Sequence, residues 1–153
     1  MRSRPRILKP LRRRDDRRGA ATVEMALVLP VFFMVMLGIV EIGRAFMVSQ
    51  LLTNAAREGA RTAIMNNSTN TEVSNLCKDI VQRTVGCAQA DVNVTMAVSE
   101  YTGNPSTGND FSLAKKRDLC QVTIQVSYDK VNLLPMRWLA GASLTGQSAM
   151  RHE

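Results

Sequence analysis

The fold is decided by residues 25–40, which read Met-Ala-Leu-Val-Leu-Pro-Val-Phe-Phe-Met-Val-Met-Leu-Gly-Ile-Val. No polar side chain interrupts this run. When the run is extended back to Ala20, the only polar residues added are Thr22 and Glu24. At about 1.5 Å per residue, residues 20–40 form a helix of roughly 31 Å, which matches the ~30 Å hydrocarbon core of a bilayer. A helix that is apolar on every face does not suit the interior of so small a chain. The sequence therefore predicts one membrane-spanning helix over residues 20–41.

The charges on either side of this run indicate its orientation. The chain of 153 residues holds 20 Lys and Arg against 13 Asp and Glu, a formal net charge of +7. Nine of these cations and only two of the acids lie in residues 1–18, so the whole excess belongs to an N-terminal arm. Because positive flanks stay in the cytoplasm, we expect a cytoplasmic N-terminus and an extracytoplasmic C-terminal part. The same distribution argues against a nucleic-acid-binding domain.

Two features in and next to this run are not explained by membrane anchoring alone. The basic arm ends at Gly19, and Glu24 is the fifth residue after it, although a carboxylate inside an apolar segment is costly. Glu24 either lies at the membrane interface and complements the helix dipole, or neutralises a new amine that cleavage between Gly19 and Ala20 leaves on Ala20. That pairing is possible within one chain or between neighbouring chains. Pro30 predicts a kink, which membrane helices tolerate.

Three stretches, in order, carry a resemblance to a known family. They are Arg18-Gly-Ala-Ala-Thr-Val-Glu-Met-Ala-Leu-Val-Leu-Pro-Val31, Leu37-Gly-Ile-Val-Glu-Ile-Gly-Arg44 and Asn54-Ala-Ala-Arg-Glu-Gly-Ala-Arg61, with a weaker echo in Met150-Arg-His-Glu153. Over residues 17–64 the chain resembles the TadE-like family, pseudopilin components of the Tad (Flp, type IVc) pilus machinery of bacteria.

The resemblance implies both processing and partners. Residues 1–19 would be a leader that a prepilin peptidase removes on the cytoplasmic face, and Glu24 would match the pilin glutamate at mature position five. The partners would be that peptidase, other pilins or pseudopilins, and the assembly platform of the inner membrane. A domain on the periplasmic side, a pilin-like fold and incorporation into a pilus that serves adhesion are further expectations.

Beyond the span, residues 42–64 change to a one-sided pattern. Apolar and small residues recur at intervals of three and four, which predicts that the helix continues with one buried stripe. The stripe comprises Ile42, Ala45, Phe46, Ser49, Leu52, Thr53, Ala56, Ala60, Ala63 and Ile64, and the opposite face comprises Glu41, Arg44, Asn54, Arg57, Glu58 and Arg61. Either the chain's own domain covers the stripe or a neighbouring subunit packs on it, and the two contacts can share residues.

Residues 65–153 predict a small extracytoplasmic domain. The capping-box spacing of Thr69 and Glu72 begins a second helix, and Gly86 ends it. Alternating apolar residues predict strands over residues 92–98 and 120–128, and a weaker pattern predicts a third over 142–151. Residues 101–110 predict a loop, and residues 132–140 a short apolar helix or turn. The fold class is therefore α+β: one long helix, a short helix and a small antiparallel sheet.

The three cysteines suit a disulfide better than a metal site, because they lack a CxxC spacing and an extracytoplasmic domain permits oxidation. We favour Cys77 with Cys120, since both lie on expected inner faces, and Cys87 is the alternative partner for Cys120. Three reduced thiols remain the other possibility.

Chemistry-bearing motifs are missing from the sequence. The single histidine is His152, and no phosphate loop, HExxH motif or cofactor fingerprint is present. We therefore expect no enzyme activity, no cofactor, no metal and no small-molecule substrate. The runner-up to a pseudopilin is an uncleaved single-pass membrane protein whose small outer domain binds a ligand or partner.

Overall fold

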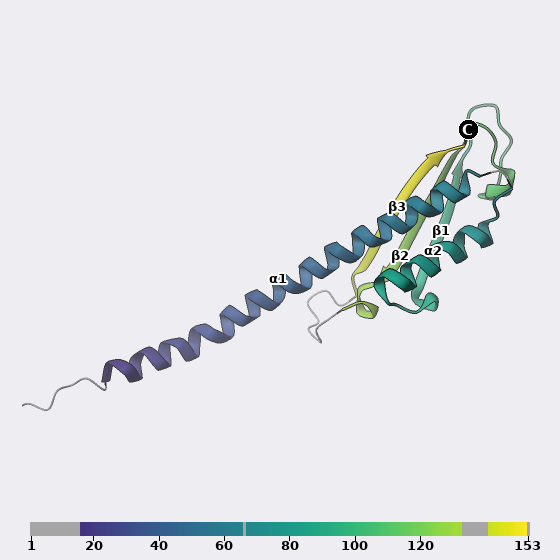
Figure 1. Ribbon diagram of the computed structural model, residues 1–153. Coiled ribbons are helices and arrows are strands. Elements are labelled where there is room, and N and C mark those ends of the chain that lie inside the picture. Colours follow the sequence, from purple (N-terminus) through teal and green to yellow (C-terminus); the bar gives the residue numbers. More distant parts are fainter. Residues whose placement is uncertain (1–15, 66, 133–140, 153) are drawn as a thin grey trace, which may run out of the picture. The chain divides into compact units, whose positions relative to one another are not determined.

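The computed structural model describes residues 16–65, 67–132 and 141–152. The chain divides into two compact units, Met1–Ile39 and Val40–Glu153. The second unit, called the domain below, contains the end of the first helix, a second helix and one sheet (Figure 1). The expected α+β architecture is confirmed.

Helix α1 runs from Asp16 to Ala63 and passes through Pro30. One continuous helix thus joins the apolar run to the amphipathic stretch, as the sequence predicts. After its last turn the Ser68 hydroxyl donates a hydrogen bond of 2.9 Å to the Ala63 carbonyl, which helps to satisfy the helix C-terminus. The kink expected at Pro30 stays a prediction.

Helix α2 spans Asn70–Val85 and has the predicted caps at both ends. The Thr69 side chain accepts a hydrogen bond of 3.3 Å from the Glu72 amide, which is the reason the helix begins there. Gly86 ends it in the left-handed conformation at φ 83°, and its amide donates to the Gln82 carbonyl. Val73, Cys77 and Val81 form its buried face.

The sheet contains β1 (Val92–Ser99), β2 (Leu119–Ser127) and β3 (Ser143–Arg151) in the order β1-β2-β3, all antiparallel. The register places Val94 opposite Ile124, and Ile124 opposite Gly146. Alternation along β2 buries Cys120, Val122, Ile124 and Val126 on one face. The predicted third strand is confirmed. The apolar turn expected over residues 132–140 lies almost wholly outside the described residues.

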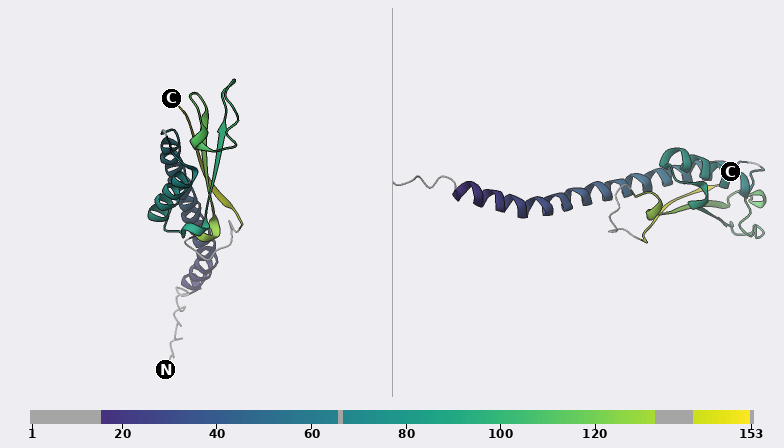
Figure 2. Two further views of the ribbon diagram at one scale, coloured as in Figure 1. Left: turned by 90° about the vertical axis from the view of Figure 1, so that its right-hand side faces the viewer. Right: turned by 90° about the horizontal axis from the view of Figure 1, so that it is seen from below.

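The domain has two layers, with α2 and the domain part of α1 against the same face of the sheet (Figure 2). Buried residues of α1, α2, β1 and β2 form one continuous core, and the partly buried Leu144 and Met150 of β3 pack against it. Along α1 the core residues are Val48, Leu52, Ala55, Ala56, Ala60 and Ala63. The chain's own domain therefore covers Leu52, Ala56, Ala60 and Ala63 of the predicted stripe. Packing of the stripe against a neighbouring subunit stays a prediction.

Candidate functional site

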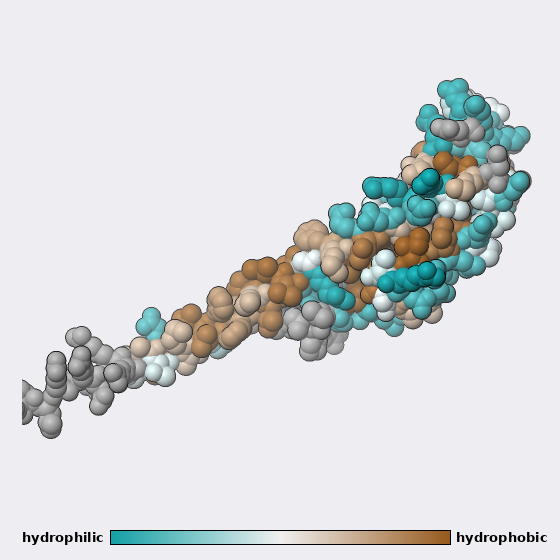
Figure 3. Space-filling view, in the orientation of Figure 1, coloured by the Kyte–Doolittle hydropathy of each residue, from teal (hydrophilic) through white to brown (hydrophobic). Residues whose placement is uncertain are grey.

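The N-terminal part of α1 has the length and composition of a membrane-spanning helix. Within the described residues, α1 is the one helix long and apolar enough to cross a membrane, by length and composition. Its large side chains, such as Leu27 at 73% exposure and Phe33 at 52%, are solvent-accessible in the isolated chain. The surface of this segment is mainly hydrophobic (Figure 3). A core helix of a soluble protein would bury such residues, so this segment suits a single membrane anchor.

The sequence-predicted processing residues lie on this segment. Gly19, Ala20 and Glu24 are all exposed and helical. Helix α1 begins three residues before Gly19, at Asp16. Ala20 and Glu24 are four residues apart, so they lie on the same face of the helix one turn apart. This spacing suits the neutralisation of an Ala20 amine by Glu24. Cleavage and neutralisation both stay predictions.

The start of the domain contains a buried polar contact that sequence reasoning missed. The Tyr128 hydroxyl, just after β2, donates a hydrogen bond to Oε1 of Glu41 on α1. Both residues are buried, at 1% and 2% exposure. Burial and the adjacent Glu41 raise the pKa of Tyr128 to about 12, against the opposing effect of Arg44. The phenol thus stays protonated and remains a donor at any physiological pH.

A second contact fixes the next turn of α1 to the domain. Arg44 Nε donates a hydrogen bond of 2.7 Å to the backbone carbonyl of Val131. Val131 follows the short 3₁₀ helix Tyr128–Lys130, so both contacts hold α1 to the same segment of chain. Among the described residues, Oε2 of Glu41 has no hydrogen-bond partner.

The burial of Glu41 shows that the predicted buried face of α1 was wrong at the start of the domain. The sequence analysis put Glu41 and Arg44 on the solvent face and Ile42 and Phe46 on the buried stripe. The structure buries Glu41 and leaves Ile42 48% and Phe46 68% exposed. The spacing of residue 41 from the buried positions 48, 52 and 55 follows the helical period and would have placed it on the buried face. The prediction instead relied on the polarity of glutamate, which usually indicates a solvent-exposed side chain.

The cysteines are free in the structure, and all three are buried. Cys77 lies on the inner face of α2, where its thiol contacts the Ala55 carbonyl of α1 at 3.8 Å. Burial raises the pKa of Cys77 and of Cys120 to about 11, with a further contribution from Asp118 at Cys120. Burial also raises the pKa of Cys87. The disulfide between Cys77 and Cys120, or Cys87 in place of Cys77, stays a prediction.

A carboxylate organises the loop between β1 and β2. Asp118, fully buried, accepts hydrogen bonds of 2.8 Å from the Tyr101 and Lys115 amides and of 2.6 Å from the Asn104 side chain. Burial alone would raise the pKa of Asp118, but these hydrogen bonds outweigh it and hold the pKa below its ordinary value. The oxygens are occupied by the chain's own donors, so the loop is a structural element.

No group of three or more His, Cys, Asp or Glu residues in the described part of the chain is placed to hold a metal ion. The polar clusters described above are each internally hydrogen-bonded, apart from the second oxygen of Glu41.

Comparison with known proteins gives one match. Residues 19–61 match the family model described as TadE-like protein. This range begins at Gly19 and ends in the last turn of α1, so it contains the apolar segment, Glu24, Glu41 and Arg44. No curated protein and no solved structure matches the chain.

Proposed function

We propose that the chain, whose residues 19–61 match the TadE-like family model, is a membrane-anchored, pseudopilin-like component of Tad pilus assembly. The main support for the proposal is that the family match lies entirely within α1. The first part of this helix suits a membrane anchor, and its second part lies in the core of the domain.

We further propose that a prepilin peptidase cleaves between Gly19 and Ala20. Three features support this step: the basic residues that precede Gly19, the exposure of both residues, and Glu24 one turn beyond the new terminus. Cleavage would remove the net charge of the N-terminal arm and leave an α-amine inside or near the apolar phase. Glu24 of the same or a neighbouring chain would then neutralise that amine.

The proposed topology follows from the same charges. The basic arm would stay in the cytoplasm and the domain would lie on the periplasmic side of the inner membrane. Its partners would be the peptidase, other pilins or pseudopilins and the assembly platform. The chain would act through assembly contacts and not through catalysis.

The decisive experiment is the intact mass of the membrane-extracted protein, expressed with and without the matching peptidase. We expect the mature chain to begin at Ala20 when the peptidase is present. A Gly19→Leu variant should remain uncleaved, because a bulky side chain would lie directly beside the scissile bond. Gly43→Ala, an exposed glycine of the same helix, is the control and should be cleaved normally.

Recovery of an intact Met1 terminus in the presence of the peptidase would refute the processing step. It would favour the alternative function, an uncleaved single-pass protein whose outer domain binds a partner.

A further inference from the structure

The exposed surface of α1 stays apolar beyond the predicted end of the membrane span. Ile42, Phe46 and Met47 belong to the domain, yet they are 48%, 68% and 52% exposed. The first exposed polar side chain that follows them on the helix is Gln50. Large exposed apolar groups gathered on one face of a helix usually mark a contact surface.

This face is apolar because the two charged side chains nearby, those of Glu41 and Arg44, are directed toward the domain. By sequence the run ends at Val40, because Glu41 and Arg44 follow. In the structure Glu41 is buried against Tyr128, and the Arg44 guanidinium is bonded to the Val131 carbonyl. Neither charge therefore interrupts the outer face of α1 between residues 40 and 49.

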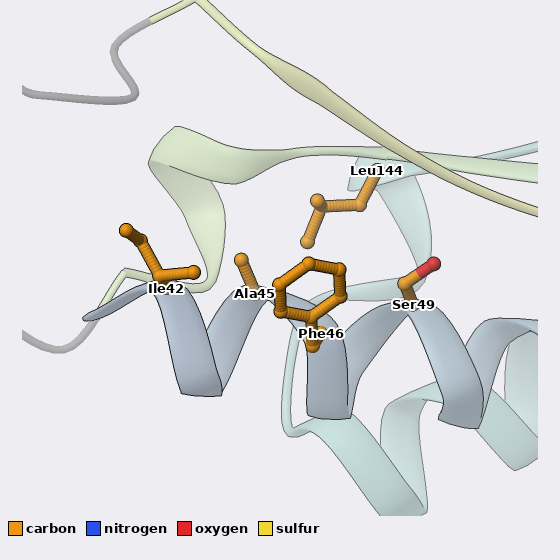
Figure 4. Close-up of a pocket in the computed structure, with 5 residues that line it drawn as sticks. All are labelled: Ile42, Ala45, Phe46, Ser49 and Leu144. Atoms are coloured by element: carbon orange, nitrogen blue, oxygen red, sulfur yellow. The ribbon is translucent and has the colours of Figure 1, made fainter. Parts of the chain in front are cut away.

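A small groove lies beside this face (Figure 4). It has a volume of about 240 Å³ and is lined by Ile42, Ala45, Phe46 and Ser49 of α1 and by Leu144 of β3. Figure 4 shows the Leu144 side chain directed toward Ala45 and Phe46. The one hydroxyl of the lining, on Ser49, donates to the Thr145 carbonyl at 3.4 Å. The groove therefore offers apolar contacts and no charge.

The position of the groove along the helix suggests its occupant. Ile42 and Phe46 lie roughly 3 and 9 Å of helix rise beyond Val40. The headgroup layer adds about 5–7 Å on each side of the hydrocarbon core, so these residues fall at the boundary between acyl chains and headgroups. A hydrocarbon chain matches an uncharged apolar groove at that level better than a polar partner does.

A second protein copy fits the groove less well. Specific protein interfaces use about 20–30 residues on each side, whereas five residues line this groove. An acyl chain needs no such area, because each methylene that it buries adds to the binding free energy.

We propose that this base of the domain, formed by Ile42, Phe46, Met47 and the groove, docks into the lipid bilayer, with a fatty acyl chain in the groove. The proposal rests on the membrane anchorage proposed above. It moves the boundary of the membrane on this face of α1 from Val40 to about one turn before Gln50.

A photoreactive benzophenone side chain at single positions of the full-length chain tests the proposal. The chain is reconstituted in vesicles of phosphatidylcholine and phosphatidylglycerol, irradiated, and analysed by mass spectrometry for lipid and protein adducts. The test positions are 46 and 47. Position 33, inside the apolar run, is the membrane control, and position 54, an exposed asparagine farther along α1, is the aqueous control.

We expect lipid adducts at positions 46 and 47 in a yield comparable with position 33 and at least about tenfold above position 54. Both test residues are more than half exposed, so the substitution leaves the core intact. A crosslink from position 46 to a second copy, or adducts no more abundant than at position 54, would overturn the proposal while leaving the anchorage in place. A lack of lipid adducts at position 33 would instead refute the anchorage itself, and the docking with it.

Discussion

Gly146 of β3 lies directly against the backbone of Leu52 on α1, at a separation that leaves no room for a side chain. A Cβ at this glycine would overlap the Leu52 carbonyl carbon and the Thr53 amide nitrogen. These are main-chain atoms of a long helix, which cannot move aside as the end of a flexible side chain would. The close approach of the last strand to the first helix therefore depends on this glycine.

Replacing this glycine should weaken the domain. We expect Gly146→Ala to lower the stability of a fragment spanning residues 40–153 by about 1–3 kcal/mol, the usual cost of overpacking. Thermal unfolding followed by circular dichroism measures the change. Gly43→Ala is the matched control: its Cβ would meet no neighbour, and alanine favours a helix, so its melting temperature should stay equal or rise. Equal melting of both variants would contradict the close contact.

Removing the Tyr128 hydroxyl should leave a buried carboxyl group without its donor. We expect Tyr128→Phe to cost about 1.5–3 kcal/mol of unfolding free energy, measured by urea denaturation. Adding Glu41→Leu should recover part of this loss, because the orphaned polar group is then gone. Tyr101→Phe, at a 39% exposed ring, is the control and should change stability by less than about 0.5 kcal/mol. A Tyr128→Phe domain as stable as the wild type would show that the contact is absent in solution.

The buried Asp118 predicts a loss of stability in acid. Its folded pKa lies below the ordinary value of 3.8, so its contribution is present above that value and is lost as pH falls through the folded pKa. Asp118→Asn should be about 1.5–3 kcal/mol less stable at pH 7 and should lose less of its remaining stability between pH 5 and pH 2. Asp79→Asn, which breaks an exposed ion pair with Arg83, should behave like wild type. Parallel pH profiles for Asp118→Asn and wild type would exclude this role.

The thiols should react slowly in the native state. With pKa values of about 11, Cys77 and Cys120 hold little thiolate at neutral pH, and both are fully buried. We expect negligible maleimide labelling of the native domain. In urea without reductant, three adducts per chain would show that all three thiols are reduced, as they are in the structure. A single adduct in urea would instead demonstrate one disulfide, and peptide mapping would show whether Cys77 or Cys87 pairs with Cys120.

Glu24 should matter for assembly and not for insertion. We expect Glu24→Gln to be cleaved and inserted normally but to reduce pilus formation, because the amide cannot neutralise the Ala20 amine. Glu58→Gln, at an exposed glutamate of the same helix, is the control and should assemble normally. Piliation and processing are scored in the same cells, by electron microscopy and intact mass. Wild-type piliation with Glu24→Gln would refute the role.

Local patterns were sufficient for most of the fold. The apolar run, the caps at Thr69 and Gly86, and the alternation along β1 and β2 are short-range signals, and each predicts an element that the structure contains. The burial of Ala56, Ala60 and Ala63 on α1 also follows from their spacing. These features are predictable because each depends on residues within one or two turns of each other.

Contacts between distant residues were not predictable in this way. Glu41 and Tyr128 are separated by 87 positions, and no residue near Glu41 in the sequence indicates that a buried tyrosine is its partner. The same holds for Gly146, whose neighbours read as an ordinary edge strand, and for the donors that surround Asp118. Such positions become visible only when the tertiary structure places the partner, which is why the phase of α1 was wrong at its first domain turn.

The sheet order has a consequence for biosynthesis. Helix α1 leaves the ribosome first and β3 last, yet the core needs both, because β3 packs on α1 through Gly146 and Leu144. During translation the apolar residues of α1 that pack against β3 therefore stay uncovered until β3 has been synthesised. A chain truncated before residue 143 would lack this strand and would leave these residues exposed.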